Sequence, residues 1–175
     1  DSIHIAVQLG NSEAVKKHLD AGADINSTAE GLHETPLDFT EESNNNLGIG
    51  GLPEDTLEIK AAKKEIADFL RKRGGKHSSI FEAAKGGDLE GIKEFLAAGV
   101  DPDEKTAFTF GAPLHVASTK EIAELLIAKG ADVNVKDNSG YTPLDYAISR
   151  SHPEIADLLR KHGGKTKKEL KAEQK

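Results

Sequence analysis

The sequence lacks cysteine and methionine entirely among its 175 residues. Without cysteine there are no disulfides, no thiol catalysis and no zinc–thiolate sites. Methionine is missing even at position 1, so we expect that the start residue was removed, by cleavage of a targeting segment or by the choice of the expressed fragment. We therefore expect a soluble protein, cytoplasmic or secreted after removal of a targeting segment, and the sequence does not decide between these compartments.

Long apolar runs and an excess of positive charge are also missing. No stretch approaches the roughly 18–20 apolar residues that cross a bilayer, which excludes a membrane span. The net charge of −7 and the pI near 5.5 argue against a nucleic-acid interface, which needs a basic face. The segment 165–175 carries five lysines against two glutamates, a balance of +3, so the chain ahead of it carries −10.

Five segments of the chain end in similar ways. Three end as AGADIN (21–26), AAGVDPD (97–103) and KGADVN (129–134), and two end with the doubled glycine of 65–76 and 154–165. Each ending follows apolar residues at helical spacing, and glycine just past such a run commonly ends a helix. The predicted helix ends are Gly22, Gly74, Gly99, Gly130 and Gly163.

The 33-residue step between the last two of these glycines contains DNSGYTPLDYAISRSHPEIADLLRKHG, which resembles an ankyrin repeat. Thr142 and Pro143 open the first helix, where the missing N–H of proline costs nothing. Ala147 is small because helices of neighbouring repeats approach closely. The matching positions are Asp137, Gly140, Thr142, Pro143, Leu144, Ala147, His152, Glu154, Ile155, Leu158, Leu159 and Gly163.

This resemblance covers about residues 2–166 and implies an all-α fold: an ankyrin-repeat solenoid of helix-turn-helix units with short β-hairpin-like loops. We predict one domain, 1–166, of about five units of the bacterial type, followed by a polar, lysine-rich tail, 167–175, that forms a helix and serves as a cap or linker. The expected units are 2–26, 27–76 with an insertion at 43–59, 79–103, 104–134 and 135–165.

A second level of repetition appears at an offset of 77 residues, which places Ser2 on Ser79 and Gly22 on Gly99. We interpret the chain as an array of two units followed by one of three, fused at KRGGKHSSI, where a hairpin is missing. Because Ser78 and Ser79 can cap the next helix directly, we predict one continuous stack.

Several positions depart from the family pattern. Residues 107–130 have Ala112 where the family has threonine, and they lack about three residues between the two helices. Asp38 and Asp145 replace the histidine of the family motif. The hydrogen bonds that this histidine normally makes to the adjoining loop are therefore in question in these two units.

The insertion adds about 18 residues to the second unit. From Pro53 onward, apolar residues keep helical spacing, so we predict that the second helix is extended backward by two or three turns. The remaining loop, 43–52, either folds back through Leu47, Ile49 and Leu52 or is mobile and polar. Its LGIGGLP run has neither the spacing nor the lysine of a phosphate-binding loop.

No residues form a convincing catalytic or metal-binding pattern. The histidines, none in a paired metal spacing, are His4, His18, His33, His77, His115, His152 and His162. We interpret His33 with Glu34 as a solvated turn, and His115 and His152 as structural. The acidic residues around the insertion read as a solvated acidic face, with a weak cation site as the alternative: Asp38, Glu41, Glu42, Glu54, Asp55 and Glu58. We predict no enzyme, no cofactor and no metal.

The resemblance implies a monomeric module that binds a protein partner, and neither nucleic acid nor membrane, on the concave face formed by hairpin tips and first helices. The acidic second unit favours a basic partner. Phe108 and Phe110 are either exposed anchors or packing between hairpins. The alternative function is a structural spacer or regulatory region of a larger or processed polypeptide. The expected contact residues are Leu32, Glu34, Glu41, Glu42, Lys105, Thr106, Phe108, Thr109, Phe110, Lys136, Asn138, Ser139, Tyr141, Ser149 and Arg150.

Overall fold

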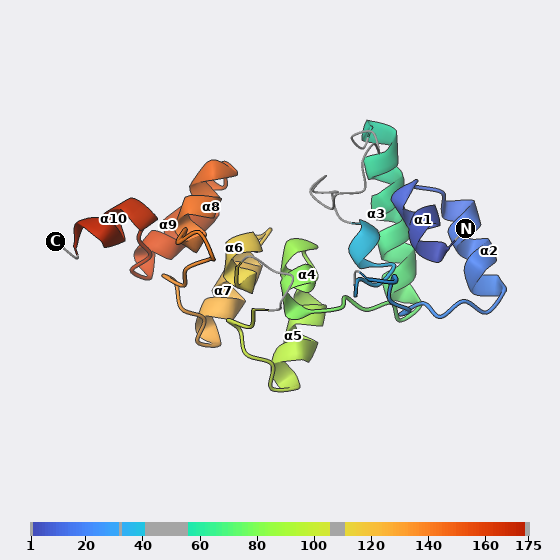
Figure 1. Cartoon of the computed structure of the whole chain (residues 1–175), viewed down its shortest axis with the longest axis horizontal. Helices are drawn as coiled ribbons and strands as arrows, with labels where there is room; N and C mark the ends of the chain where they lie inside the picture. Colours follow the sequence, from blue (N-terminus) through green and yellow to red (C-terminus); the bar gives the residue numbers. More distant parts are fainter. Residues whose placement is uncertain (1, 32, 41–55, 106–110, 174–175) are drawn as a thin grey trace. The chain divides into compact units, whose positions relative to one another are not determined.

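The computed structural model describes residues 2–31, 33–40, 56–105 and 111–173 (Figure 1). The chain divides into two compact units, Asp1–Ser78 and Ser79–Lys175. The boundary falls inside KRGGKHSSI, the segment that the sequence identified as the fusion between two arrays. The single continuous stack stays a prediction.

The first unit is built from helix pairs around a small core. Its elements are α1 (Ile3–Gln8), α2 (Ser12–Asp20), the 3₁₀ turn η1 (Asp38–Thr40) and α3 (Leu57–Lys72). α1 packs beside η1, and α2 packs beside α3. The core is formed by apolar residues three or four positions apart, so that each helix turns one face inward. These residues are Ile3, Ala6, Val7, Val15, Leu37, Ile66, Ala67 and Leu70.

The second unit repeats the helix pair three times. Its elements are α4 (Ile80–Lys85), α5 (Leu89–Ala97), α6 (Pro113–Val116), α7 (Lys120–Ala128), α8 (Pro143–Ser149), α9 (Pro153–Lys161) and α10 (Lys167–Ala172). α4, α6 and α8 lie side by side as one layer, and α5, α7 and α9 form a second layer (Figure 1). Ile92, Leu114, Ile122, Leu126, Leu144 and Leu159 are almost completely buried between the layers.

The structure confirms the predicted helix ends. All five glycines have positive φ angles: 89° at Gly22, 87° at Gly74, 86° at Gly99, 97° at Gly130 and 85° at Gly163. Most of the described helices begin at a side-chain cap, α6 and α9 being exceptions, because the first N–H groups of a helix have no partner within it. Ser79 caps α4 by accepting a hydrogen bond from the Glu82 N–H (3.2 Å). The sequence predicted the glycine ends and the Ser79 cap correctly because each depends on residues within one helical turn.

The all-α fold class is also confirmed, since the described residues form helices and no strand. The loops before η1 and α8 close like hairpins. The Ala29 N–H donates to the Glu34 carbonyl (2.9 Å), and the Asp137 N–H donates to the Tyr141 carbonyl (2.9 Å). These bonds keep each loop compact without a β-ladder.

Helix α3 has the backward extension that the sequence predicted, but not its predicted start. It spans 16 residues, whereas α2, α5, α7 and α9 span nine each. We expected it to begin at Pro53; instead Thr56 is extended and its hydroxyl accepts a hydrogen bond from the Ile59 N–H (3.2 Å), so the helix begins at Leu57. The predicted loop at 43–52 lies outside the described residues.

Helix α6 shows the effect of the missing residues between the helices of its unit. It has only four residues. The chain then leaves the helix at Ala117, and the Ser118 hydroxyl donates to the Ala84 carbonyl (3.1 Å) before Thr119 caps α7. The shorter connection therefore removes helix turns from α6 and leaves α7 at nine residues.

The two glycines that follow α9 are required for different reasons, one for its backbone conformation and one for lack of space, which gives a matched test. A Cβ on Gly163 would meet open space and only its φ of +85° opposes it, whereas a Cβ on Gly164 would lie 2.8 Å from the Leu159 carbonyl oxygen. Urea unfolding should show a loss of about 3 kcal/mol for Gly164→Ala, because backbone atoms must shift. Gly163→Ala should cost only about 1 kcal/mol. Equal losses would contradict the steric explanation.

Candidate functional site

The expected contact residues divide into those that the structure describes and those that it does not. Seven of them lie outside the described residues: Leu32, Glu41, Glu42, Thr106, Phe108, Thr109 and Phe110. Glu34 lies in the first unit, half-buried, where its carbonyl closes the loop before η1. The other contact residues that the structure describes belong to the second unit.

In the second unit, the hairpin-like loop 135–141 is held by the buried carboxylate of Asp137. One of its oxygens accepts hydrogen bonds from the N–H groups of Ser139 and Tyr141 (2.8 Å each). The other accepts the hydroxyl of Tyr146 on α8 (2.9 Å). Burial alone would raise the pKa of Asp137, but these hydrogen bonds outweigh it and lower the pKa. The carboxylate therefore fixes the loop and ties it to α8.

His115 on α6 also holds this loop in place. Its Nδ1 accepts a hydrogen bond from the Ala112 N–H (3.1 Å), and its Nε2 donates to the Tyr141 carbonyl (3.1 Å). Burial lowers the pKa of His115 below its usual range, although both backbone contacts oppose this shift. The imidazole is fully used within the fold, in agreement with the structural role expected from the sequence.

The remaining side chains of this region point outward, away from the buried side chains of Asp137 and His115. We define the hairpin–α8 face as the exposed residues Lys136, Asn138, Ser139, Tyr141, Ser149 and Arg150. The Arg150 guanidinium lies 5.2 Å from the centre of the Tyr146 ring and donates to the His115 carbonyl (3.3 Å). Lys105 donates to the Lys136 carbonyl (2.6 Å). The face thus offers amide, hydroxyl, aromatic and cationic groups on a fixed backbone.

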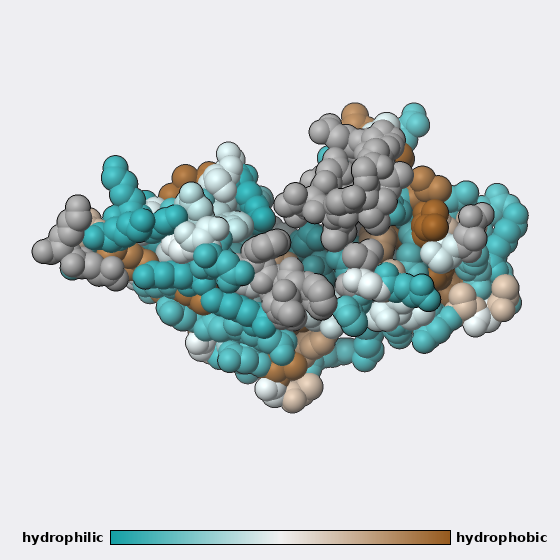
Figure 2. All heavy atoms as spheres, viewed as in Figure 1, coloured by the Kyte–Doolittle hydropathy of each residue, from teal (hydrophilic) through white to brown (hydrophobic). Residues whose placement is uncertain are grey.

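Exposed large apolar side chains supplement this set, and the sequence did not identify them as contacts. Ile148 is half exposed on α8, while Ile5 and Leu9 in the first unit are 48% and 56% exposed. Figure 2 shows hydrophobic spheres at the surface in the region of α1. Isolated exposed apolar residues are normal at a protein surface, whereas contact surfaces gather several of them.

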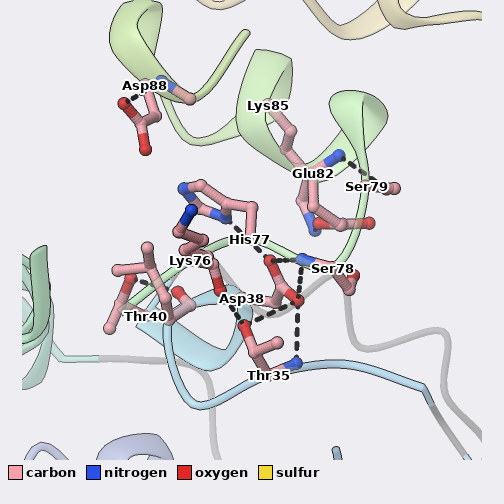
Figure 3. A network of polar contacts seen from close by, with 12 residues as sticks. Thr35, Asp38, Thr40, Lys76, His77, Ser78, Ser79, Glu82, Lys85 and Asp88 are labelled. Carbon is pink, nitrogen blue, oxygen red and sulfur yellow. Dashed lines mark hydrogen bonds and ion pairs between the residues drawn. The ribbon is translucent and has the colours of Figure 1, made fainter. Parts of the chain in front are cut away.

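Asp38 in the first unit corrects one expectation. We interpreted it as part of a solvated acidic face, but it is 5% exposed and lies at the centre of a polar network (Figure 3). The N–H and hydroxyl of Thr35 donate to one carboxylate oxygen (2.8 and 3.0 Å). His77 Nδ1 donates to the other (2.7 Å), and the Ser78 N–H also donates to the carboxylate (3.1 Å).

The network changes how the carboxyl group ionises. Burial by itself would raise the pKa of Asp38, but the hydrogen bond and charge of His77, with the bonds from Thr35 and Ser78, lower it. The side chains of Asp38 and His77 are completely buried. A pair closed off from solvent in this way supports the fold and is not placed to act on a substrate.

The aspartates that replace the family motif's histidine still hold the following segment, but they accept a hydrogen bond where the histidine donates one. Asp38 accepts the Ser78 N–H, and in the second unit Asp145 accepts the Lys167 N–H (2.8 Å). His115, in contrast, donates to a carbonyl of the following loop. The question raised by these two substitutions is therefore resolved: the anchor is kept, because a carboxylate binds an N–H where an imidazole binds a carbonyl.

Other kinds of site find no support in the part of the chain that the structure describes. Within it, no three histidine or acidic side chains are arranged to hold a metal ion, and no helix has the length and apolar character needed to cross a membrane.

Comparison with known proteins gives a consistent result. A model described as ankyrin repeats (3 copies) matches residues 80–170, just over half of the chain. The chain is 38% identical over 90 residues to serine/threonine-protein kinase 12 of Arabidopsis thaliana, covering 47% of this chain and 18% of that protein.

Two further relatives are regulatory proteins by name. The chain is 30% identical over 135 residues to the ARF GTPase-activating protein Git of Drosophila melanogaster, covering 73% of this chain and 17% of the relative. It is 31% identical over 106 residues to protein phosphatase 1 regulatory subunit 12A of Mus musculus, covering 57% and 10%. The chain therefore spans less than a fifth of the length of these relatives.

Proposed function

Because the chain belongs to the ankyrin repeat family, we propose that it is a non-enzymatic module that binds a protein partner on the face formed by its hairpin tips and first helices. Members of this family are generally interaction domains. Two of the relatives bear names of proteins that regulate others, a GTPase-activating protein and a phosphatase regulatory subunit. We further propose five repeats in a monomeric chain; the bacterial type stays a prediction from sequence.

One observation carries this proposal. The side chains that hold the hairpin–α8 face in place, Asp137, His115 and Thr142, are buried and hydrogen-bonded. The side chains of the face itself are exposed. A rigid frame that presents varied side chains binds a partner without losing much conformational entropy.

The proposal is tested by affinity capture with the whole chain. We expect Ser149→Glu combined with Arg150→Glu to reduce recovery of a specific partner at least tenfold, because both side chains are exposed on α8. Lys161→Glu, exposed at the end of α9, is the matched control and should leave recovery unchanged. Phe108→Ser with Phe110→Ser, at expected contact positions outside the described residues, should also lower recovery in the same assay.

Two results would count against this function. Equal recovery with all variants would remove the hairpin–α8 face as the binding surface. Failure to capture any partner whose recovery depends on the variants would favour the alternative, a structural spacer or regulatory region of a larger polypeptide.

A further inference from the structure

The C-terminal helix α10 places one lysine on the hairpin–α8 face. The ammonium group of Lys167 donates to the Ser139 carbonyl (2.8 Å) and lies 4.0 Å from the centre of the Tyr141 ring. Lys167 Cε also comes within 3.7 Å of the position that a Cβ on Gly140 would occupy. A cation over an aromatic ring that also reaches a carbonyl has the two interactions that best recognise a lysine side chain.

Little else holds α10 in place. The helix has six residues and none of them is buried. Among the described residues, its other polar contacts are the Lys167 N–H with Asp145, the ion pair of Glu169 with Arg160 (3.5 Å) and, just after the helix, that of Glu173 with Lys165 (2.6 Å), while Leu170 is half-buried. So short a helix is marginal in water, and exposed ion pairs contribute less than about 1 kcal/mol each. Another chain can therefore displace it at a small cost.

The surface beneath Lys167 is also open to a side chain from outside. Tyr141 is 46% exposed even with Lys167 above its ring, and Ser139 is exposed. Gly140 has a φ of +81° and no side chain to obstruct the approach. The chain ahead of residue 165 carries −10, which attracts a basic segment over longer distances.

We propose that Tyr141 and the Ser139 carbonyl form a subsite for one lysine of a basic partner segment, and that Lys167 fills this subsite until the partner displaces α10. This proposal rests on the proposed function and adds the partner's chemistry and an internal competitor. Since the tail is tethered, its effective concentration is high, on the order of millimolar. Removing its lysine should therefore expose the subsite to a peptide added in solution.

The test uses the peptide of residues 165–173, KTKKELKAE, as the probe. The peptide carries a fluorescent label at its N-terminus and its binding is followed by anisotropy, so Tyr146 keeps the hydrogen bond to Asp137 that holds the loop. The tail variant combines Lys167→Ala with Leu170→Pro, which breaks α10 without touching a buried residue. We expect it to bind the peptide at least tenfold more tightly than the chain with the native tail.

Two controls isolate the lysine. The chain with Lys168→Ala and Leu170→Pro keeps Lys167 and should bind the peptide more weakly than the tail variant. A peptide with norleucine in place of the residue equivalent to Lys167 keeps the shape but loses the charge. It should lose about fivefold in affinity, as expected for one cation–π contact near the surface.

The proposal is overturned if the two peptides bind the tail variant equally, if native and variant tails respond alike, or if no saturable response appears. A dimer of the unmodified chain that requires Lys167, seen by sedimentation, would assign the subsite to a second copy and also overturn it. These results are independent of partner capture. If a partner is captured through Arg150 but the peptide test fails, only the lysine subsite is refuted. If the peptide binds as expected but no partner is captured, only the proposed function is refuted.

Discussion

Replacing Asp38 by alanine is expected to lower the free energy of unfolding of the first unit by about 3–5 kcal/mol, because several donors lose their acceptor at about 1–3 kcal/mol each. The substitution leaves His77 and the N–H groups of Thr35 and Ser78 without the carboxylate that they contact. Urea unfolding, followed by circular dichroism and by amide exchange within residues 2–78, measures the loss.

Asp145→Ala is the matched control in the second unit. Its carboxylate accepts from Thr142 and Lys167, but it is only half-buried and has no histidine partner. We expect a loss of about 1–2 kcal/mol, as for ordinary hydrogen bonds. If both alanine variants lose the same amount, the buried histidine pair contributes nothing beyond the backbone contacts.

Asp38→Asn adds a pH signature to this comparison. The pKa of Asp38 is lowered in the folded chain, so the ionised group contributes stability above the unfolded pKa of about 3.9. That contribution is lost as the pH falls through the folded-state pKa. The stability difference between the unmodified chain and Asp38→Asn should therefore shrink below about pH 4. A difference that stays constant down to pH 2 would contradict the role assigned to the charge.

Leu126→Ala is expected to cost the second unit about 2–5 kcal/mol, because the side chain is fully buried and its loss leaves a cavity. It lies on α7 between the helix layers, where its neighbours belong to several helices and cannot all move inward. Leu125→Ala, at the adjacent and only partly buried position, is the control and should cost clearly less. Thermal unfolding and amide exchange within residues 111–173 test the pair.

Much of the candidate site was accessible from sequence because it follows a periodic motif. Thr142, Pro143 and Ala147 mark where α8 begins and which side faces its neighbours, and the exposed positions follow from that register. The pattern therefore predicted Ser149 and Arg150 as exposed. It did not predict the contact between Arg150 and the His115 carbonyl, since that depends on how two helices 35 positions apart are packed.

Asp38 shows why charge patterns misled the sequence interpretation. An aspartate followed by two glutamates resembles a solvated acidic face, because charged residues are rarely buried unless they are paired. Its partner His77 is 39 residues away, across the insertion, so no local pattern connects them. The same limit applies to Lys167 and Tyr141, whose contact depends on where α10 begins.

The sequence by itself determined the five glycine helix ends, the caps at Ser79 and Thr142, the family and the lengthened α3. Each of these depends on residues within one or two helical turns, where glycine φ preferences, capping side chains and apolar spacing act directly. Only the tertiary structure decided that Asp38 is interior, that α3 begins at Leu57 and that Lys167 lies on Tyr141. The first and third of these depend on partners distant in sequence. In all three cases the favoured arrangement depends on burial, capping and charge together, and these depend on the neighbours that the folded chain provides.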